Sequence, residues 1–97
     1  MMTELEKTVW DKLADLWNID AEIRPEVEAD TALFHFPNEE APDKMIPVEL
    51  DSMDYMDMLL MLEDDYGLKN LEQSELDHLM TVREVAALIE AKGAAKQ

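Results

Sequence analysis

All four prolines of this chain lie between positions 25 and 47, and this clustering constrains the fold more than any other feature. Each proline removes a backbone donor and disfavours helix in the residue before it. The segment from about Ile19 to Leu50 also lacks helical periodicity, so it is predicted to be one long loop. A loop of this length inside a compact domain is unusual unless it is functional.

This loop is not purely polar, so part of it is expected to return to the core. The apolar residues expected to anchor it are Ala32, Leu33, Phe34 and Phe36. The stretch from Asn38 to Lys44 is expected to be its exposed part.

Before the loop, a helix is predicted from about Thr3 to Asn18. Thr3 and Glu6 have capping-box spacing, in which each side chain accepts a hydrogen bond from the other residue's backbone amide. The apolar face at helical spacing is expected to contain Leu5, Val9, Leu13 and Leu16, and Trp10 and Trp17 are expected to lie beside this face and widen it.

After the loop, a second helix is predicted from Asp51 or Ser52 to about Tyr66. Asp51 is a good N-cap, and Gly67 stands where a left-handed C-terminal cap is wanted. Apolar residues occur almost all round this helix. Such a helix is either central in the fold or has a second face meant for a partner.

A short helix is predicted from Ser74 to His78, because Ser74 and Asp77 repeat the capping spacing. The last helix is predicted to open at Thr81, with Glu84 completing another capping box, and to end at Gly93. Its apolar stripe is Val82, Val85, Ala86 and Ile89.

The predicted fold is therefore all-α: a bundle of three main helices plus one short helix, with a long loop between the first two main helices. The chain has 97 residues, so one domain over positions 1–97 is expected. A hydrophobic content of 47% argues against intrinsic disorder.

The charge is extreme. There are 24 acidic residues against 8 lysines and arginines, a formal net charge of -16. Such a surface repels nucleic acid and anionic lipid but attracts basic protein surfaces. The alternative is that the acids only keep a small protein soluble.

The chain has no cysteine, so disulfides and thiolate metal sites are excluded, and no metal site is expected. No stretch approaches the length of a membrane span, and no basic region followed by an apolar run opens the sequence. A monomeric cytoplasmic protein that does not insert into membranes is the expectation.

The stretch from Glu49 to Asp57 carries the most chemistry. It places Ser52 at the mouth of a helix, where unpaired first-turn amides and the helix dipole would stabilise a phosphodiester. His35 and His78 are far away in sequence, and no nucleophile elbow surrounds the serine. Ser52 is therefore expected to be modified by another enzyme and not to act as a catalyst.

Here the sequence resembles the acyl carrier protein family. The family's Asp-Ser-Leu signature at the start of its second helix reads Asp51-Ser52-Met53 in this chain. The resemblance covers nearly the whole chain, in helix order, charge and size, and it is strongest from Leu50 to Tyr66.

The resemblance implies that a phosphopantetheinyl transferase, assisted by Mg2+, moves a 4'-phosphopantetheine arm from coenzyme A onto Ser52. Acyl groups would then travel as thioesters on the thiol of the arm, and the protein would serve other enzymes as substrate and shuttle. The pathway stays open among fatty acid, polyketide and related specialised biosynthesis, including amino-acyl transfer.

The resemblance also implies two sets of binding residues. The set that would dock on basic patches of partner enzymes is Asp51, Met53, Asp54, Met56, Asp57, Leu60, Glu63 and Asp64. The set that would face the core and the acyl cavity is Leu59, Leu62 and Tyr66.

Three departures from the family pattern indicate a specialised carrier. Met53 replaces the usual leucine, the loop is longer around Asn38 to Pro47, and Val48-Glu49-Leu50 replaces a region of small residues. The Gly-Gly-x-Ser motif of peptidyl carriers is absent.

Two alternatives remain at this point. Ser52 could be only a helix-capping residue. The acidic run from Glu63 to Asp65 could be only a solvated face, and whether it also binds divalent cations loosely stays open. The competing function is an unmodified helical interaction module, whose acidic, methionine-rich surface binds basic or amphipathic partners.

Overall fold

The fold is a small helical bundle. The computed structural model describes residues 2–34, 40 and 42–93. Its α-helices are α1 (Glu4–Leu16), α2 (Ser52–Tyr66), α3 (Gln73–Leu76) and α4 (Val82–Ala91), with one 3-10 turn, η1 (Arg24–Glu26), after α1. Two isolated bridges at Ala32 are the extent of β structure in this part of the chain. The predicted all-α architecture of three main helices and one short helix is confirmed at this level.

The capping box of α1 forms as predicted. The Thr3 hydroxyl accepts from the Glu6 amide at 3.2 Å, and the Glu6 carboxylate accepts from the Thr3 amide at 2.7 Å. The helix ends at Leu16, two positions before the predicted Asn18, which adopts a left-handed φ of 56°.

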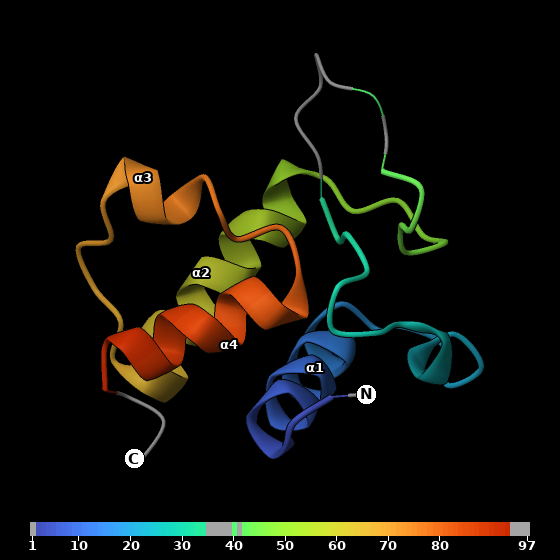
Figure 1. The fold of residues 1–97 in the computed structure, drawn as a ribbon, viewed down its shortest axis with the longest axis horizontal. Helices are drawn as coiled ribbons and strands as arrows, with labels where there is room; N and C mark the ends of the chain where they lie inside the picture. Colours follow the sequence, from blue (N-terminus) through green and yellow to red (C-terminus); the bar gives the residue numbers. More distant parts are fainter. Residues whose placement is uncertain (1, 35–39, 41, 94–97) are drawn as a thin grey trace.

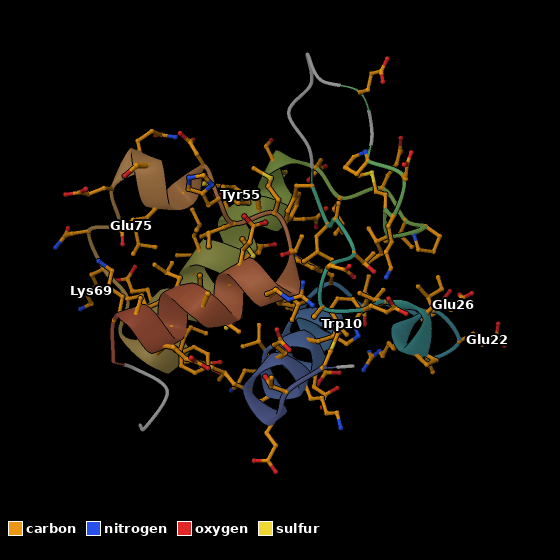
Figure 2. The ribbon with its side chains drawn as sticks, in the orientation of Figure 1. Trp10, Glu22, Glu26, Tyr55, Lys69 and Glu75 are labelled. Atoms are coloured by element: carbon orange, nitrogen blue, oxygen red, sulfur yellow. The ribbon has the colours of Figure 1, made fainter. Side chains whose placement is uncertain are left out.

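The predicted apolar face of α1 was partly wrong. The error concerns Leu16, which is 42% exposed. Trp10 is only 4% exposed and widens the buried face as predicted. The Trp10 indole donates to the Arg24 carbonyl at 3.0 Å, so its body packs in the core while its polar edge is satisfied by η1. Figure 2 shows Trp10 between α1 and η1, with Glu22 and Glu26 directed outward.

Both ends of α2 lie where the sequence predicted them. Asp51 is the N-cap, and the Asp54 carboxylate accepts from the Asp51 amide at 2.9 Å. Gly67 closes the helix with a φ of 67°, a conformation that costs glycine little.

The start of α3 differs from the prediction. The helix begins at Gln73 and is capped at Glu72, whose amide donates to the Glu75 carboxylate at 3.0 Å. Ser74 therefore lies inside the first turn, and the cap spacing of Ser74 and Asp77 was misleading. At α4, the Thr81 hydroxyl accepts from the Glu84 amide at 3.1 Å, but within the described residues only this half of the predicted capping box forms.

Helix α1 packs against both α4 and α2, and α4 crosses in front of α2 in Figure 1. Buried side chains from all three helices form one core with residues of the loop. The last helix contributes the whole predicted stripe of Val82, Val85, Ala86 and Ile89.

The long loop is attached to the bundle at Leu33. Its amide donates to the Met80 carbonyl at 2.7 Å, and its side chain is fully buried. Beside it, the Ala32 amide donates to the Lys44 carbonyl and the Ile46 amide to the Ala32 carbonyl, each at 2.9 Å. The predicted anchor is confirmed for Ala32, Leu33 and Phe34, which are all buried.

Some sequence-based expectations concern positions outside the described residues. These are the anchoring role of Phe36, the place of His35 and part of the stretch from Asn38 to Lys44. Within the described ranges, no helix is both long and apolar enough to cross a membrane.

We expect Leu33→Ala to lower the free energy of unfolding by about 2–5 kcal/mol, because it leaves a cavity where the loop meets the core. Leu60→Ala is the matched control, since Leu33 is 0% and Leu60 is 55% exposed. Removing the same atoms at the exposed site should change the free energy by about 0.5 kcal/mol or less. Urea denaturation measures both, and equal losses would contradict the anchoring role of Leu33.

Candidate functional site

Ser52 is exposed and is the first residue of α2. Its position follows from Asp51, whose carboxylate accepts from the amides of Met53 at 3.0 Å and Asp54 at 3.1 Å and so fixes where the helix begins. These two amides were expected to be free for a phosphodiester on Ser52. Because Asp51 already accepts from both amides, the start of α2 has fewer free donors for an anion than the sequence indicated.

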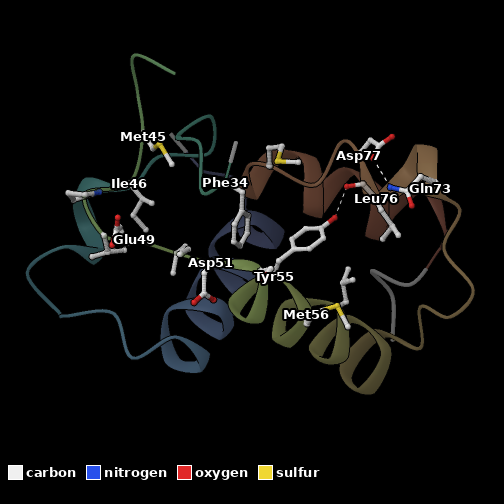
Figure 3. A pocket seen from close by; sticks show the side chains of 16 residues that line it. Phe34, Met45, Ile46, Glu49, Asp51, Tyr55, Met56, Gln73, Leu76 and Asp77 are labelled. Carbon is white, nitrogen blue, oxygen red and sulfur yellow. Dashed lines mark hydrogen bonds between the residues drawn. The ribbon is translucent and has the colours of Figure 1, made fainter. Parts of the chain in front are cut away.

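A cavity of about 900 Å³ opens beside Ser52, which is one of its wall residues. We call it the Ser52 pocket. It lies between the last part of the long loop, the first turns of α2, and α3 with the residues that follow it (Figure 3). Its walls are formed by Phe34, Met45, Ile46, Pro47, Val48, Glu49, Leu50, Asp51, Ser52, Tyr55, Met56, Leu59, Gln73, Leu76, Asp77 and Met80. Its size is in the range of pockets that bind small molecules.

An aromatic chain supports one wall of the pocket. Phe34 packs edge-on between Trp17 and Tyr55, with ring centroids 5.6 Å and 5.2 Å away. The Trp17 indole donates to the Asp54 carbonyl at 3.0 Å, so it also ties the end of α1 to the first turn of α2. The loop, α1 and the start of α2 are therefore held together at the point where Ser52 stands.

Tyr55 links α2 to α3 across the pocket. Its hydroxyl donates to the Leu76 carbonyl at 2.6 Å, as the dashed line in Figure 3 shows. Burial, and then the negative charge of Asp77, raises the pKa of Tyr55 above its ordinary value of 10.0. The phenol therefore stays neutral and keeps donating over the physiological pH range.

The residues predicted for an acyl cavity do not lie together in the Ser52 pocket. Leu59 lines it. Leu62 and Tyr66 are buried in the core instead and are not among the described wall residues. The walls that sequence reasoning missed come from the loop residues 45–50 and from α3, which meet α2 only through the tertiary fold.

The residues predicted for partner docking are mostly exposed on α2. Met53, Met56 and Leu60 are 73%, 57% and 55% exposed, while Met58 and Met61 are buried. The apolar residues of α2 therefore divide between a buried face and an exposed face. We define the outer face of α2 as Met53, Met56, Asp57, Leu60, Glu63 and Asp64, all of which are exposed.

The two other predicted docking acids have structural partners. Asp51 and Asp54 form the capping box of α2, and Asp54 is only partly exposed. By contrast, Asp57, Glu63 and Asp64 form no ion pair within the described residues, although the neighbouring Asp65 binds Lys12 at 3.2 Å. The described part of the chain also contains no group of three or more His, Asp or Glu residues arranged to hold a metal ion.

In an alkaline titration followed by ultraviolet absorbance, we expect Tyr55 to ionise at a higher pH than a free phenol. Because its folded pKa is raised, its contribution to stability is complete below the unfolded pKa of about 10 and is lost as the pH rises through the folded pKa. Asp77→Asn should move the pKa of Tyr55 back toward the ordinary value, because it removes the second cause of the shift. Tyr55→Phe identifies the signal, and a Tyr55 titration unchanged by Asp77→Asn would contradict this account.

Comparison with family models, with curated proteins and with solved structures gave no match for this chain. The resemblance to acyl carrier proteins therefore rests on the residues of the chain itself and stays a prediction.

Proposed function

We propose that this chain is an acyl carrier protein, with a 4'-phosphopantetheine arm attached to Ser52. The observation that carries the proposal is the place of this serine. Ser52 is exposed at the start of a helix and is also a wall residue of a largely apolar pocket of about 900 Å³. A group attached there has both solvent access for exchange with enzymes and an apolar pocket within reach.

Attachment of the arm requires no catalytic group from this chain. The Ser52 oxygen forms a bond to the phosphorus of coenzyme A that bears the pantetheine, the phosphoanhydride bond breaks, and the adenosine bisphosphate leaves with the bonding electrons. The serine proton passes to the transferase. Because the Ser52 hydroxyl makes no hydrogen bond within the described residues, no internal partner has to be displaced first.

The helix arrangement also supports the proposal. Three main helices, a short third helix and a long loop before the Ser52 helix form the order that the family resemblance implies. The Ser52 pocket opens between the loop, α2 and α3, so an acyl group on the arm has walls from three separate segments.

The outer face of α2 supports a role in docking. Its acids lack ion pairs within the described residues, and its methionines and leucine are exposed. A partner enzyme with a basic patch around an apolar centre would complement this face.

The same outer face favours the competing function, an unmodified acidic interaction module. Such a module needs the exposed apolar side chains of α2 but does not need Ser52 or the pocket beside it. The two functions therefore differ in what happens at Ser52.

We expect a broad-specificity phosphopantetheinyl transferase, given coenzyme A and Mg2+, to add one arm to the purified chain. The added mass is measured on the intact protein. Ser52→Ala should abolish the addition. The chain has one other serine, Ser74, which is also exposed, so Ser74→Ala is the matched control and should load normally.

An unchanged mass with several transferases would reject the carrier function and favour the interaction module. Loading that survives in Ser52→Ala would reject the assignment of the site.

We expect Asp57→Lys combined with Asp64→Lys to slow arm loading roughly tenfold at low salt, because opposite charge steers encounter with a basic enzyme. Loading by the variant should also depend less on salt. Both residues are exposed and free of caps and ion pairs in the described structure, so the change leaves the start of α2 intact.

The matched control is Asp11→Lys with Glu90→Lys, which makes the same charge change at exposed positions of α1 and α4. Equal slowing by the two double variants would show that net charge, and not the outer face of α2, controls the rate.

A further inference from the structure

The charged residues among the described walls of the Ser52 pocket are all acidic. Glu49, Asp51 and Asp77 contribute carboxylates, and no lysine, arginine or histidine is found among the described wall residues. Figure 3 shows Glu49 and Asp51 on the loop side and Asp77 beyond Tyr55, so the carboxylates flank the pocket from opposite ends. Most of the remaining wall is apolar.

No cation compensates these carboxylates within the described residues. Asp51 accepts from backbone amides, and Asp77 accepts from the Gln73 side-chain amide at 2.8 Å, but both of these partners are neutral. Glu49 has no ion pair in the described structure. Clefts with low-dielectric walls and charges of one sign focus the field toward the ligand. The raised pKa of Tyr55 agrees, because the charge of Asp77 is one of its causes.

The neutral polar groups of the pocket point to the same ligand chemistry. The proton of the Tyr55 hydroxyl is already donated to the Leu76 carbonyl, and the Gln73 amide nitrogen is engaged with Asp77. What remains for a ligand at this end is one N–H of the Gln73 amide as a donor and, as acceptors, the Asp77 carboxylate and the Tyr55 oxygen. A ligand ending in a carboxylate needs donors there, whereas an ammonium group needs acceptors.

We infer that the Ser52 pocket takes an apolar chain ending in a protonated amine in preference to one ending in a carboxylate. This inference about the cargo rests on the proposed carrier function. If acyl groups are carried on Ser52, the preferred one has an amine at its far end. Acyl groups ending in a carboxylate are disfavoured by repulsion from both ends of the pocket.

The test uses the unmodified full chain, so it does not depend on arm loading. Hexylammonium, hexanol and hexanoate share one apolar chain and differ in the end group. Their dissociation constants are measured by nuclear magnetic resonance, from the methyl signals of the wall residues Met56 and Met80. About 0.15 M salt limits the influence of distant charges, since the screening length is then about 8 Å.

We expect hexylammonium to bind most tightly and hexanoate least tightly. Asp77→Asn and Glu49→Gln should each reduce the preference for hexylammonium over hexanoate by up to about fivefold, the effect of one solvent-accessible charge pair. Asp11→Asn is the matched control, because it removes the same charge from an exposed position of α1 outside the pocket and should leave the preference unchanged.

Hexanoate binding as tightly as hexylammonium would overturn the inference. An equal loss of preference in all three variants would overturn it too, since the net charge of the chain would then be the cause. If none of the three compounds shifts the wall methyl signals, the pocket assignment fails, while loading of Ser52 still decides the carrier function separately.

Discussion

The attachment of Leu33 and Phe34 to the bundle is the interaction on which the site depends. The Leu33 amide reaches the Met80 carbonyl, and Phe34 packs between Trp17 and Tyr55. Backbone bonds from Ala32 then hold the segment around Lys44 and Ile46, which leads directly into the pocket wall. Without this attachment the residues before Ser52 would have no fixed place opposite α3. A loop that sequence alone describes as irregular thereby becomes half of the pocket.

Asp51 stabilises the start of α2 but weakens the anion binding that was expected there. Its carboxylate fixes the start of α2, and therefore the position of Ser52, by accepting from the Met53 and Asp54 amides. Those bonds, with two carboxylates at the helix start, leave little positive potential for a phosphodiester. The case for Ser52 as an attachment point consequently rests more on its exposure and its pocket than on the helix dipole.

Features set by neighbouring residues could be predicted from the sequence. The Thr3 and Asp51 caps, the Gly67 stop and the buried stripe of α4 all arise within one or two helical turns. Predictions failed mainly where contacts between segments far apart in the sequence determine which side chains are buried. Leu16 was expected on the buried face of α1 but is 42% exposed, whereas Trp10 is buried where α1 meets η1. The cap of α3 was missed for a local reason, because it falls on Glu72, a residue type that rarely caps. Of the residues expected at an acyl cavity only Leu59 is among the described walls of the pocket, and the walls from Phe34, loop residues 45–50 and α3 could not be predicted because they meet α2 only in the tertiary fold.

The acids that give the chain its net charge of -16 have different roles, which depend on the partners of each carboxylate. Asp51 and Asp54 accept from backbone amides and keep their charge, whereas Asp65 is paired with Lys12 and so contributes little to long-range attraction. Uncompensated acids occur in several parts of the described chain, Asp11 and Glu90 among them, and two groups of them lie on the outer face of α2 and at the rim of the Ser52 pocket. In the proposed function the two groups would act on different molecules: the first on a macromolecule approaching α2, the second on a group that enters the pocket.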